Sequence, residues 1–120
     1  MNIGNVYKVT VEVSEIQSPN QSNLLRVLIA RRWPGAIAKK EVDQWDPDIA
    51  ASAVLTDALN NREIDPDQFR NLYAKELKQN NSLLIWLEKI AQGSGLHLLI
   101  DTNDKSSELC AQVITYELEK

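Results

Sequence analysis

The sequence predicts an α/β fold: a single domain over residues 1–120, with a small, mainly parallel sheet of three or four strands and helices packed on both faces. Two apolar segments, residues 24–30 and 96–100, are typical of strands covered on both faces. Because helical patterns lie between them, we expect these strands to be parallel neighbours. Residues 5–13 alternate apolar and polar side chains, which indicates a half-buried strand near the sheet edge.

The segment after the first buried strand predicts a turn and then two helices. Trp33-Pro34-Gly35 ends the strand, because proline cannot donate to a sheet ladder and glycine favours a turn. We expect a short helix over residues 39–45. Asp46-Pro47 is typical of an N-cap followed by proline in the first helical position, so it predicts the start of an alanine-rich helix over residues 49–59.

Three further helices are expected downstream. Asp65-Pro66 repeats the start signal, and Gln68 is placed to complete a capping box. Ser82 is expected to cap the next helix, which ends at the glycines before residue 96. Asp104 or a neighbour is expected to cap the last helix. The second of these helices is expected to bury one apolar stripe: Leu83, Leu84, Leu87, Ile90 and Ala91.

The bulk composition is that of an ordinary globular protein. The 120 residues are 43% hydrophobic and 25% charged, which is enough for a hydrophobic core and gives no indication of disorder. No apolar run is long enough to cross a bilayer, and the first residues lack the pattern of a signal peptide. With one cysteine there is no internal disulfide. We therefore expect a cytoplasmic protein without a membrane partner.

The charges are unevenly distributed along the chain. The net charge of −4 argues against non-specific nucleic-acid binding over the whole surface. Residues 26–40 carry five basic side chains and no acidic one, whereas residues 41–67 carry eight acidic side chains and only Arg62. Adjacent blocks of opposite sign usually neutralise each other across a folded surface. Nucleic-acid binding through residues 26–40 is therefore the weakest functional interpretation.

The carboxyl edge of the predicted sheet concentrates the candidate chemistry. If the two buried strands are parallel, Arg31 after the first and Asp101, Asn103 and Asp104 after the second lie at the same edge. Ligands of open α/β sheets bind outside this edge. Arg31 could hold a phosphate or carboxylate through paired hydrogen bonds. Alternatively, it could form a structural ion pair with Asp101 or Asp104, or with the acidic block that begins at Glu41.

Two motifs resemble a known family. Arg31, Trp33 and Pro34 form an Arg-x-Trp-Pro pattern directly after an apolar strand, and Ser52 follows in an alanine-rich segment. A second block consists of Asp65, Pro66, Phe69, Tyr73, Glu76 and Leu77. Together these residues resemble the YeaO-like proteins, the small bacterial and archaeal family called domain of unknown function 488. The resemblance covers about residues 5–118.

The chain departs from this family mainly at polar positions. Ala30 replaces an aspartate at the strand end, and Gly35 replaces a second arginine. Ile64 replaces a histidine, and Ser107-Glu108-Leu109 stands where the family has a cluster of histidine and asparagine. The resemblance therefore implies a divergent member that keeps the framework and has lost much of the polar set suspected of forming a site.

The candidate site residues each have an ordinary structural explanation. Arg31, Trp33 and Ser52 are the binding candidates, although a tryptophan after a buried strand usually closes the core. Asp101 and Asp104 are weak candidates for an acid or base. Their loop does not match a calcium-binding pattern, so we expect no metal and no cofactor.

The histidine and the cysteine do not predict catalysis. His97 is the single histidine, and it lies at the start of its strand, at the wrong edge to act with Ser52. Cys110 lies on the apolar face of a helix, where a cysteine is usually inert.

We therefore favour a non-catalytic or degenerate binding or interaction member of the family. The alternative is a small-molecule enzyme for an anionic substrate, with Arg31 as clamp, Ser52 as polar contact and Asp101 or Asp104 as acid or base. The expected partners are a small anionic ligand and, through the edge strand, a second copy of the chain.

Overall fold

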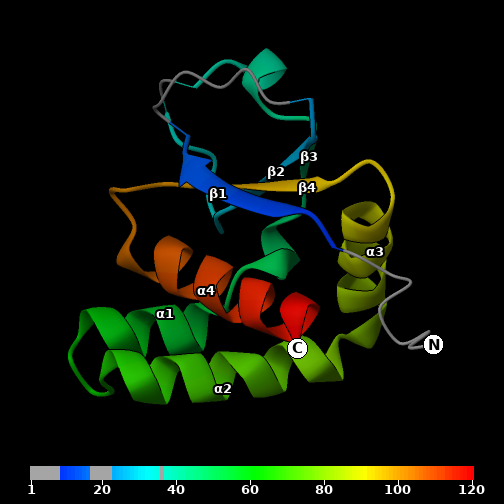
Figure 1. Cartoon of the computed structure of the whole chain (residues 1–120). Helices are drawn as coiled ribbons and strands as arrows, with labels where there is room; N and C mark the ends of the chain where they lie inside the picture. The colour runs from blue at the N-terminus through cyan, green and yellow to red at the C-terminus, as the bar shows by residue number, and fades with distance from the viewer. Residues whose placement is uncertain (1–8, 17–22, 36) are drawn as a thin grey trace.

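The computed structural model describes residues 9–16, 23–35 and 37–120 (Figure 1). Its strands form one sheet in the order β1-β4-β2-β3, and each neighbouring pair is parallel. The predicted α/β class is thereby confirmed. The strands are β1 (Val11–Glu15), β2 (Leu25–Ile29), β3 (Gln44–Trp45) and β4 (Leu96–Ile100).

The two apolar strands form the centre of the sheet, as predicted. β2 and β4 pair in parallel from Leu25 opposite Leu96 to Ile29 opposite Ile100. All of β4 and the last three residues of β2 are buried. The carboxyl ends of both strands therefore lie at the same edge, which is the arrangement that the candidate site requires.

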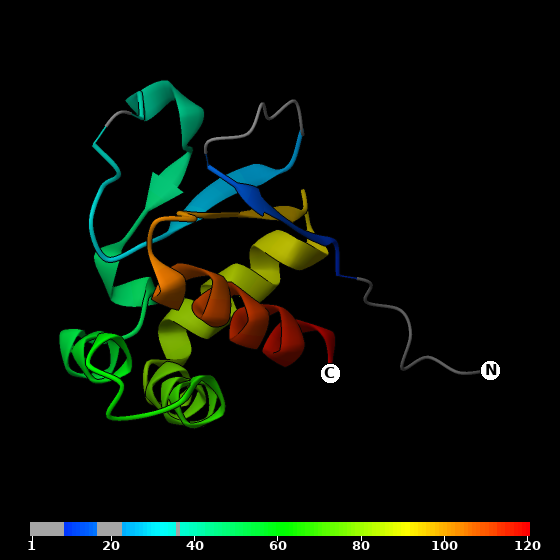
Figure 2. The same ribbon diagram turned by 90° about the vertical axis from the view of Figure 1, so that its left-hand side faces the viewer.

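The four α-helices of the described chain lie on one face of the sheet (Figures 1 and 2). Two of them, α3 and α4, contact β4 directly, and α2 packs against both. The fourth, α1, packs against α2. The helices are α1 (Ala53–Asn60), α2 (Pro66–Gln79), α3 (Asn81–Gln92) and α4 (Lys105–Glu119). The main hydrophobic core lies between these helices and the sheet.

The second face of the sheet is covered by residues 33–35 and 37–45, which include one 3-10 helix, η2 (Lys39–Glu41) (Figure 2). Because side chains alternate along a strand, Val27 and Ile29 face the helices, while Leu28 and Ala30 face this covering segment. A smaller second core results. Its buried members are Ile16, Leu28, Ala30 and Leu99, and the side chains packed against them are Trp33, Ile37, Val42 and Trp45.

Two of the predicted helices differ in the structure. The helix expected over residues 39–45 is only the 3-10 turn η2, after which the chain pairs with β2 as β3. The Asp43 carboxylate accepts hydrogen bonds from Arg26 of β2, which holds the segment extended beside that strand. The helix expected over residues 49–59 is likewise split into the 3-10 helix η3 (Pro47–Ile49) and α1.

The capping predictions are largely confirmed. Asp65 and Gln68 form the expected capping box at the start of α2, and the Asp104 side chain accepts from the Ser106 N–H at the start of α4. The prediction for Ser82 was wrong, because α3 begins at Asn81, two residues earlier than a cap at Ser82 implies, with Asn80 in the N-cap position. Asn80 is also the C-cap of α2, so one residue ends a helix and begins the next.

The amino-terminal strand lies at the sheet edge, as predicted, but over Val11–Glu15. Residues 5–8 of the predicted strand lie outside the described residues. Among the described residues, no helix combines the length and the apolar character needed to cross a membrane.

Candidate functional site

The side chains expected at the carboxyl edge do follow β2 and β4, but in the part of the chain that the structure describes Arg31 forms no ion pair with the aspartates that follow β4. Arg31 donates from Nη1 to the carbonyl oxygen of Ala51 at 3.3 Å. Among the described residues, no ion pair joins Arg31 to Asp101 or Asp104. The structural ion pair considered for Arg31 is therefore not formed.

The two aspartates are held by their own loop and helix. The Asp101 carboxylate accepts from the Asn103 N–H, and its own N–H donates to the Ser107 hydroxyl. The Asp104 carboxylate accepts from both the N–H and the hydroxyl of Ser106, which fixes it as the cap of α4. Their positions thus follow from local backbone geometry.

Arg31 lies between two pockets. The larger, which we call the edge pocket, has a volume of about 590 Å³ and lies between the end of β2 and the starts of α1 and α4. Its charged side chains are three cations, Arg31, Arg32 and Lys105, and two carboxylates, Asp57 and Asp104. Thr56, Asn60 and Asn103 add neutral polar groups. Since cations outnumber carboxylates, the edge pocket suits an anion.

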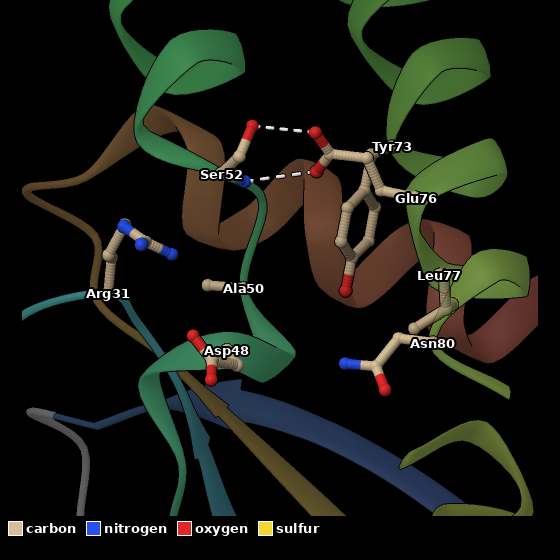
Figure 3. Close-up of a pocket in the computed structure, with 8 residues that line it drawn as sticks. All are labelled: Arg31, Asp48, Ala50, Ser52, Tyr73, Glu76, Leu77 and Asn80. Carbon is tan, nitrogen blue, oxygen red and sulfur yellow. Dashed lines mark hydrogen bonds between the residues drawn. The ribbon is translucent and has the colours of Figure 1, made fainter. Parts of the chain in front are cut away.

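The smaller pocket, which we call the inner pocket, has a volume of about 230 Å³ and is shown in Figure 3. Arg31 lies on one side of it, while Tyr73 and Glu76 of α2 lie on the other. Two carboxylates, Asp48 and Glu76, line it together with this single arginine. Its charge balance therefore disfavours the binding of a further negative group, in contrast to the edge pocket.

Ser52 and Glu76 form a tight contact at the mouth of the inner pocket (Figure 3). The Ser52 hydroxyl donates to Glu76 Oε2 at 2.6 Å, and the Ser52 N–H donates to Glu76 Oε1 at 3.0 Å. The same hydroxyl accepts from the Leu55 N–H at 3.3 Å, so Ser52 is the N-cap of α1. A carboxylate at the start of a helix is electrostatically favourable. Ser52 is thus explained by its role in positioning α1.

Glu76 is the pocket residue that sequence reasoning missed as a site candidate. It is part of the Phe-x-x-x-Tyr-x-x-Glu-Leu block, which was interpreted as framework. The signal that could have identified it is that Ser52 and Glu76 both match the family's pattern, whereas most of the family's other polar positions are replaced in this chain. Their separation of 24 residues gives no local pattern that connects them.

Two buried ionisable groups next to the inner pocket, Cys110 and Tyr73, stay uncharged at neutral pH. Burial raises the pKa of the Cys110 thiol to about 12, so the thiolate is not populated at neutral pH. Burial also raises the pKa of Tyr73 well above its usual value, and its hydroxyl donates to the Ile49 carbonyl. The expectation of an inert Cys110 agrees with this environment.

Trp33 lies on the second face of the sheet and lines neither pocket that contains Arg31. Its Nε1 donates to the Ile37 carbonyl at 2.9 Å, and its ring meets Trp45 edge to face, with centroids 5.4 Å apart. This is the environment of a tryptophan that closes a core.

His97 lies in the amino-terminal half of β4, where Nε2 shares a hydrogen bond with the Ser14 hydroxyl. It is therefore not at the carboxyl edge with Ser52, in agreement with the sequence-based expectation. Within the described parts of the chain, no group of three or more histidine, cysteine, aspartate or glutamate side chains could hold a metal ion.

The basic segment is partly neutralised within the chain. Arg26 forms an ion pair with Asp43, with Nη2 and Oδ1 3.0 Å apart, and Arg26 Nε also donates to Asp43 Oδ2 at 3.1 Å. The contact lowers the pKa of Asp43 and raises that of Arg26. A basic side chain paired in this way contributes little to an electrostatic surface for phosphates.

A family model matches residues 10–120, and it is described as the inactive DUF488-N3 subclade. The match covers both kept motifs, and it confirms the resemblance that those motifs indicated. No curated protein and no solved structure matches the chain.

Proposed function

The chain belongs to the inactive DUF488-N3 subclade, and from this premise we propose that it is a non-catalytic module that binds a small phosphate- or carboxylate-bearing anion in the edge pocket. The strongest support for the proposal comes from the contacts that the Arg31 side chain makes. Its half-buried guanidinium has one backbone acceptor and no ion pair within the described part of the chain.

Arg31 has the donors that an anion needs. A guanidinium presents several N–H groups in a planar fork, and the hydrogen bond to Ala51 uses only Nη1. The remaining donors can hold a phosphate or carboxylate through two parallel bonds. Because the side chain is already partly shielded from water, such a contact is stronger than one at a fully exposed arginine.

At the neighbouring helix starts, carboxylates already accept from part of the backbone. Glu76 accepts from the Ser52 N–H at the start of α1, and Asp104 accepts from the Ser106 N–H at the start of α4. An anion in the edge pocket therefore depends on the side-chain cations Arg31, Arg32 and Lys105. Of these, Arg32 and Lys105 are exposed and contribute mainly to the long-range field.

Three observations weigh against the enzyme alternative. The Ser52 hydroxyl already donates to Glu76 and accepts from the α1 backbone, so it is not poised as a nucleophile. Asp104 is engaged by Ser106, and Asp101 does not line either pocket next to Arg31. The only cysteine is buried, with its pKa raised to about 12. Ser52, Asp101, Asp104 and Cys110 are therefore not arranged as a nucleophile with a base.

The test is a thermal-shift screen of phosphorylated and carboxylated metabolites, with inorganic pyrophosphate as the reference probe. A ligand at about one hundred times its dissociation constant stabilises the protein by about 2.7 kcal/mol. We expect Arg31→Ala to weaken binding by about tenfold or more, since it removes a charge-assisted contact of about 1.5–3 kcal/mol. Arg32→Ala should weaken it less.

Lys89→Ala is the matched control, because it removes one exposed positive charge on α3 outside both pockets. It should leave ligand affinity unchanged. An unaltered thermal shift in Arg31→Ala would contradict the proposed site. Turnover of a bound ligand would contradict the non-catalytic role.

A further inference from the structure

The outer edge of the sheet at β1 is unpaired within the described residues. β1 pairs with β4 on one side and has no strand on the other. The Thr10 carbonyl accepts from Leu96 N–H at 2.8 Å, and Ile16 N–H donates to the Ile100 carbonyl at 2.7 Å. Because backbone groups alternate in direction along a strand, Val11, Val13 and Glu15 turn their N–H and C=O groups away from β4. These groups form an open template for another strand.

An apolar groove lies beside this edge. It has a volume of about 440 Å³, and its walls come from the end of β4, from Val13 of β1 and from one side of α4. Val13 is 45% exposed and Tyr116 is 65% exposed, although both are large apolar side chains. Ile100 and Ala111 form the floor between them. A strand added to β1 would cover these side chains.

The charges around the groove define what can bind there. Glu108 and Glu119 are the only charged residues that line it, and both are exposed. β1 itself, with the sequence VEVSE, carries Glu12 and Glu15 and no basic residue. The surface thus combines an open backbone edge, an apolar groove and an acidic rim. A second copy that paired through its own β1 would bring glutamates together from both molecules, which is unfavourable.

We propose that β1 and this groove bind an extended segment of a partner protein in which apolar and basic side chains alternate. The segment adds a strand to the sheet at Val11, Val13 and Glu15, a recognition mode in which backbone hydrogen bonds supply affinity and side-chain pockets supply specificity. Its apolar side chains fill the groove beside Val13 and Tyr116. Because side chains alternate along a strand, its lysine or arginine side chains lie on the opposite face of the sheet, beside Glu12 of β1, and the glutamates of the rim attract them at longer range, which disfavours acidic partners.

The test uses two labelled synthetic octapeptides, one alternating valine with lysine and one alternating valine with glutamate. We expect the basic peptide to bind at least about tenfold more tightly, with an affinity that falls as salt is added. Exchanging three glutamates, with Glu12→Lys, Glu108→Lys and Glu119→Lys, should reverse this preference. Equal affinity for the two peptides, or no binding of either, would overturn the proposal.

Strand addition has its own test at Val13. Val13→Pro removes an outward-facing donor while leaving the pairing with β4 in place, and proline is tolerated at such an edge position. It should abolish binding, whereas Val13→Thr, which keeps the donor but exchanges a methyl group of the groove for a hydroxyl, should weaken binding far less. In the unsubstituted protein, bound peptide should slow hydrogen exchange at the Val11, Val13 and Glu15 amides, a readout that does not depend on the fold of a variant. Unchanged exchange there, or a dimer of the chain that is lost in Val13→Pro, would overturn the proposal.

Discussion

At the scale of single residues, His97 is a titratable group that the chain keeps buried. Its side chain is only 5% exposed, Nε2 contacts the Ser14 hydroxyl, and Nδ1 has no hydrogen-bond partner among the described residues. Burial lowers the pKa of His97, and the positive charge of Arg26 acts in the same direction. Glu12 acts in the opposite direction but does not reverse the shift. The folded state therefore favours the neutral imidazole.

This environment predicts that stability falls on mild acidification. The unfolded chain binds a proton at His97 near the ordinary pKa of 6.5, whereas the folded chain resists it, so the free energy of unfolding decreases as the pH falls below about 6.5. The slope cannot exceed about 1.4 kcal/mol per pH unit for one group. Urea unfolding between pH 7.5 and 5 should show the decrease. His97→Gln, which removes the only histidine, should flatten it. An equal slope in both proteins would show that other groups are responsible.

At the scale of secondary-structure elements, the start of α1 depends on a contact with α2. Ser52 caps α1 and is held by the Glu76 carboxylate. We predict that Ser52→Ala lowers the free energy of unfolding by about 1–2 kcal/mol, because it removes both the cap and the hydroxyl bond. Glu76→Ala should be destabilising as well. The double variant should be less destabilised than the sum, by about 1 kcal/mol, since the two residues form one contact.

Urea unfolding of the single variants and the double variant measures this coupling. Ser94→Ala, a change of an exposed serine between α3 and β4, is the matched control and should have little effect. Additive effects of Ser52→Ala and Glu76→Ala would mean that the hydrogen bonds between them do not contribute to stability.

The elements that could be predicted are those whose signals are local. The apolar runs of β2 and β4 predicted strands buried on both faces, and Asp65 with Gln68 predicted a helix start, because periodicity and capping operate within a few residues. The break in the chain before α1 could not be predicted in this way. It depends on Tyr73 holding the Ile49 carbonyl and on Glu76 holding Ser52, contacts that span 24 residues.

The candidate site likewise combines features that local sequence signals predict with features that depend on contacts between distant residues. The placement of Arg31 at the carboxyl edge followed from two parallel strands, so strand type alone was sufficient to predict it. Whether Arg31 meets a carboxylate depends on loop geometry, and Asp104 is instead held by Ser106. The two pockets next to Arg31 arise from how α1 and α2 pack. Helix packing over such separations leaves no pattern in a single sequence.

At the scale of the whole molecule, the sheet separates two cores of unequal size. The α-helices cover one face, and residues 33–35 and 37–45 cover the other through a small cluster around Leu28 and Leu99. Trp45 joins this covering segment to the sheet, because its Nε1 donates to the Ala30 carbonyl at 2.7 Å and its ring packs on the second core. A segment with few buried contacts can open without unfolding of the remainder.

We therefore predict that the covering segment opens before the helices do. Native-state hydrogen exchange should show amides of residues 37–45 exchanging at a lower free energy than those of β4 and α4. Trp45→Ala should widen the difference, because it removes the indole contacts and costs about 2–4 kcal/mol, whereas Trp45→Phe keeps an aromatic ring and should cost less. Helix amides should be affected less than those of the segment. A uniform loss of protection in Trp45→Ala would contradict the prediction, because it would mean that both faces of the sheet unfold as one cooperative unit.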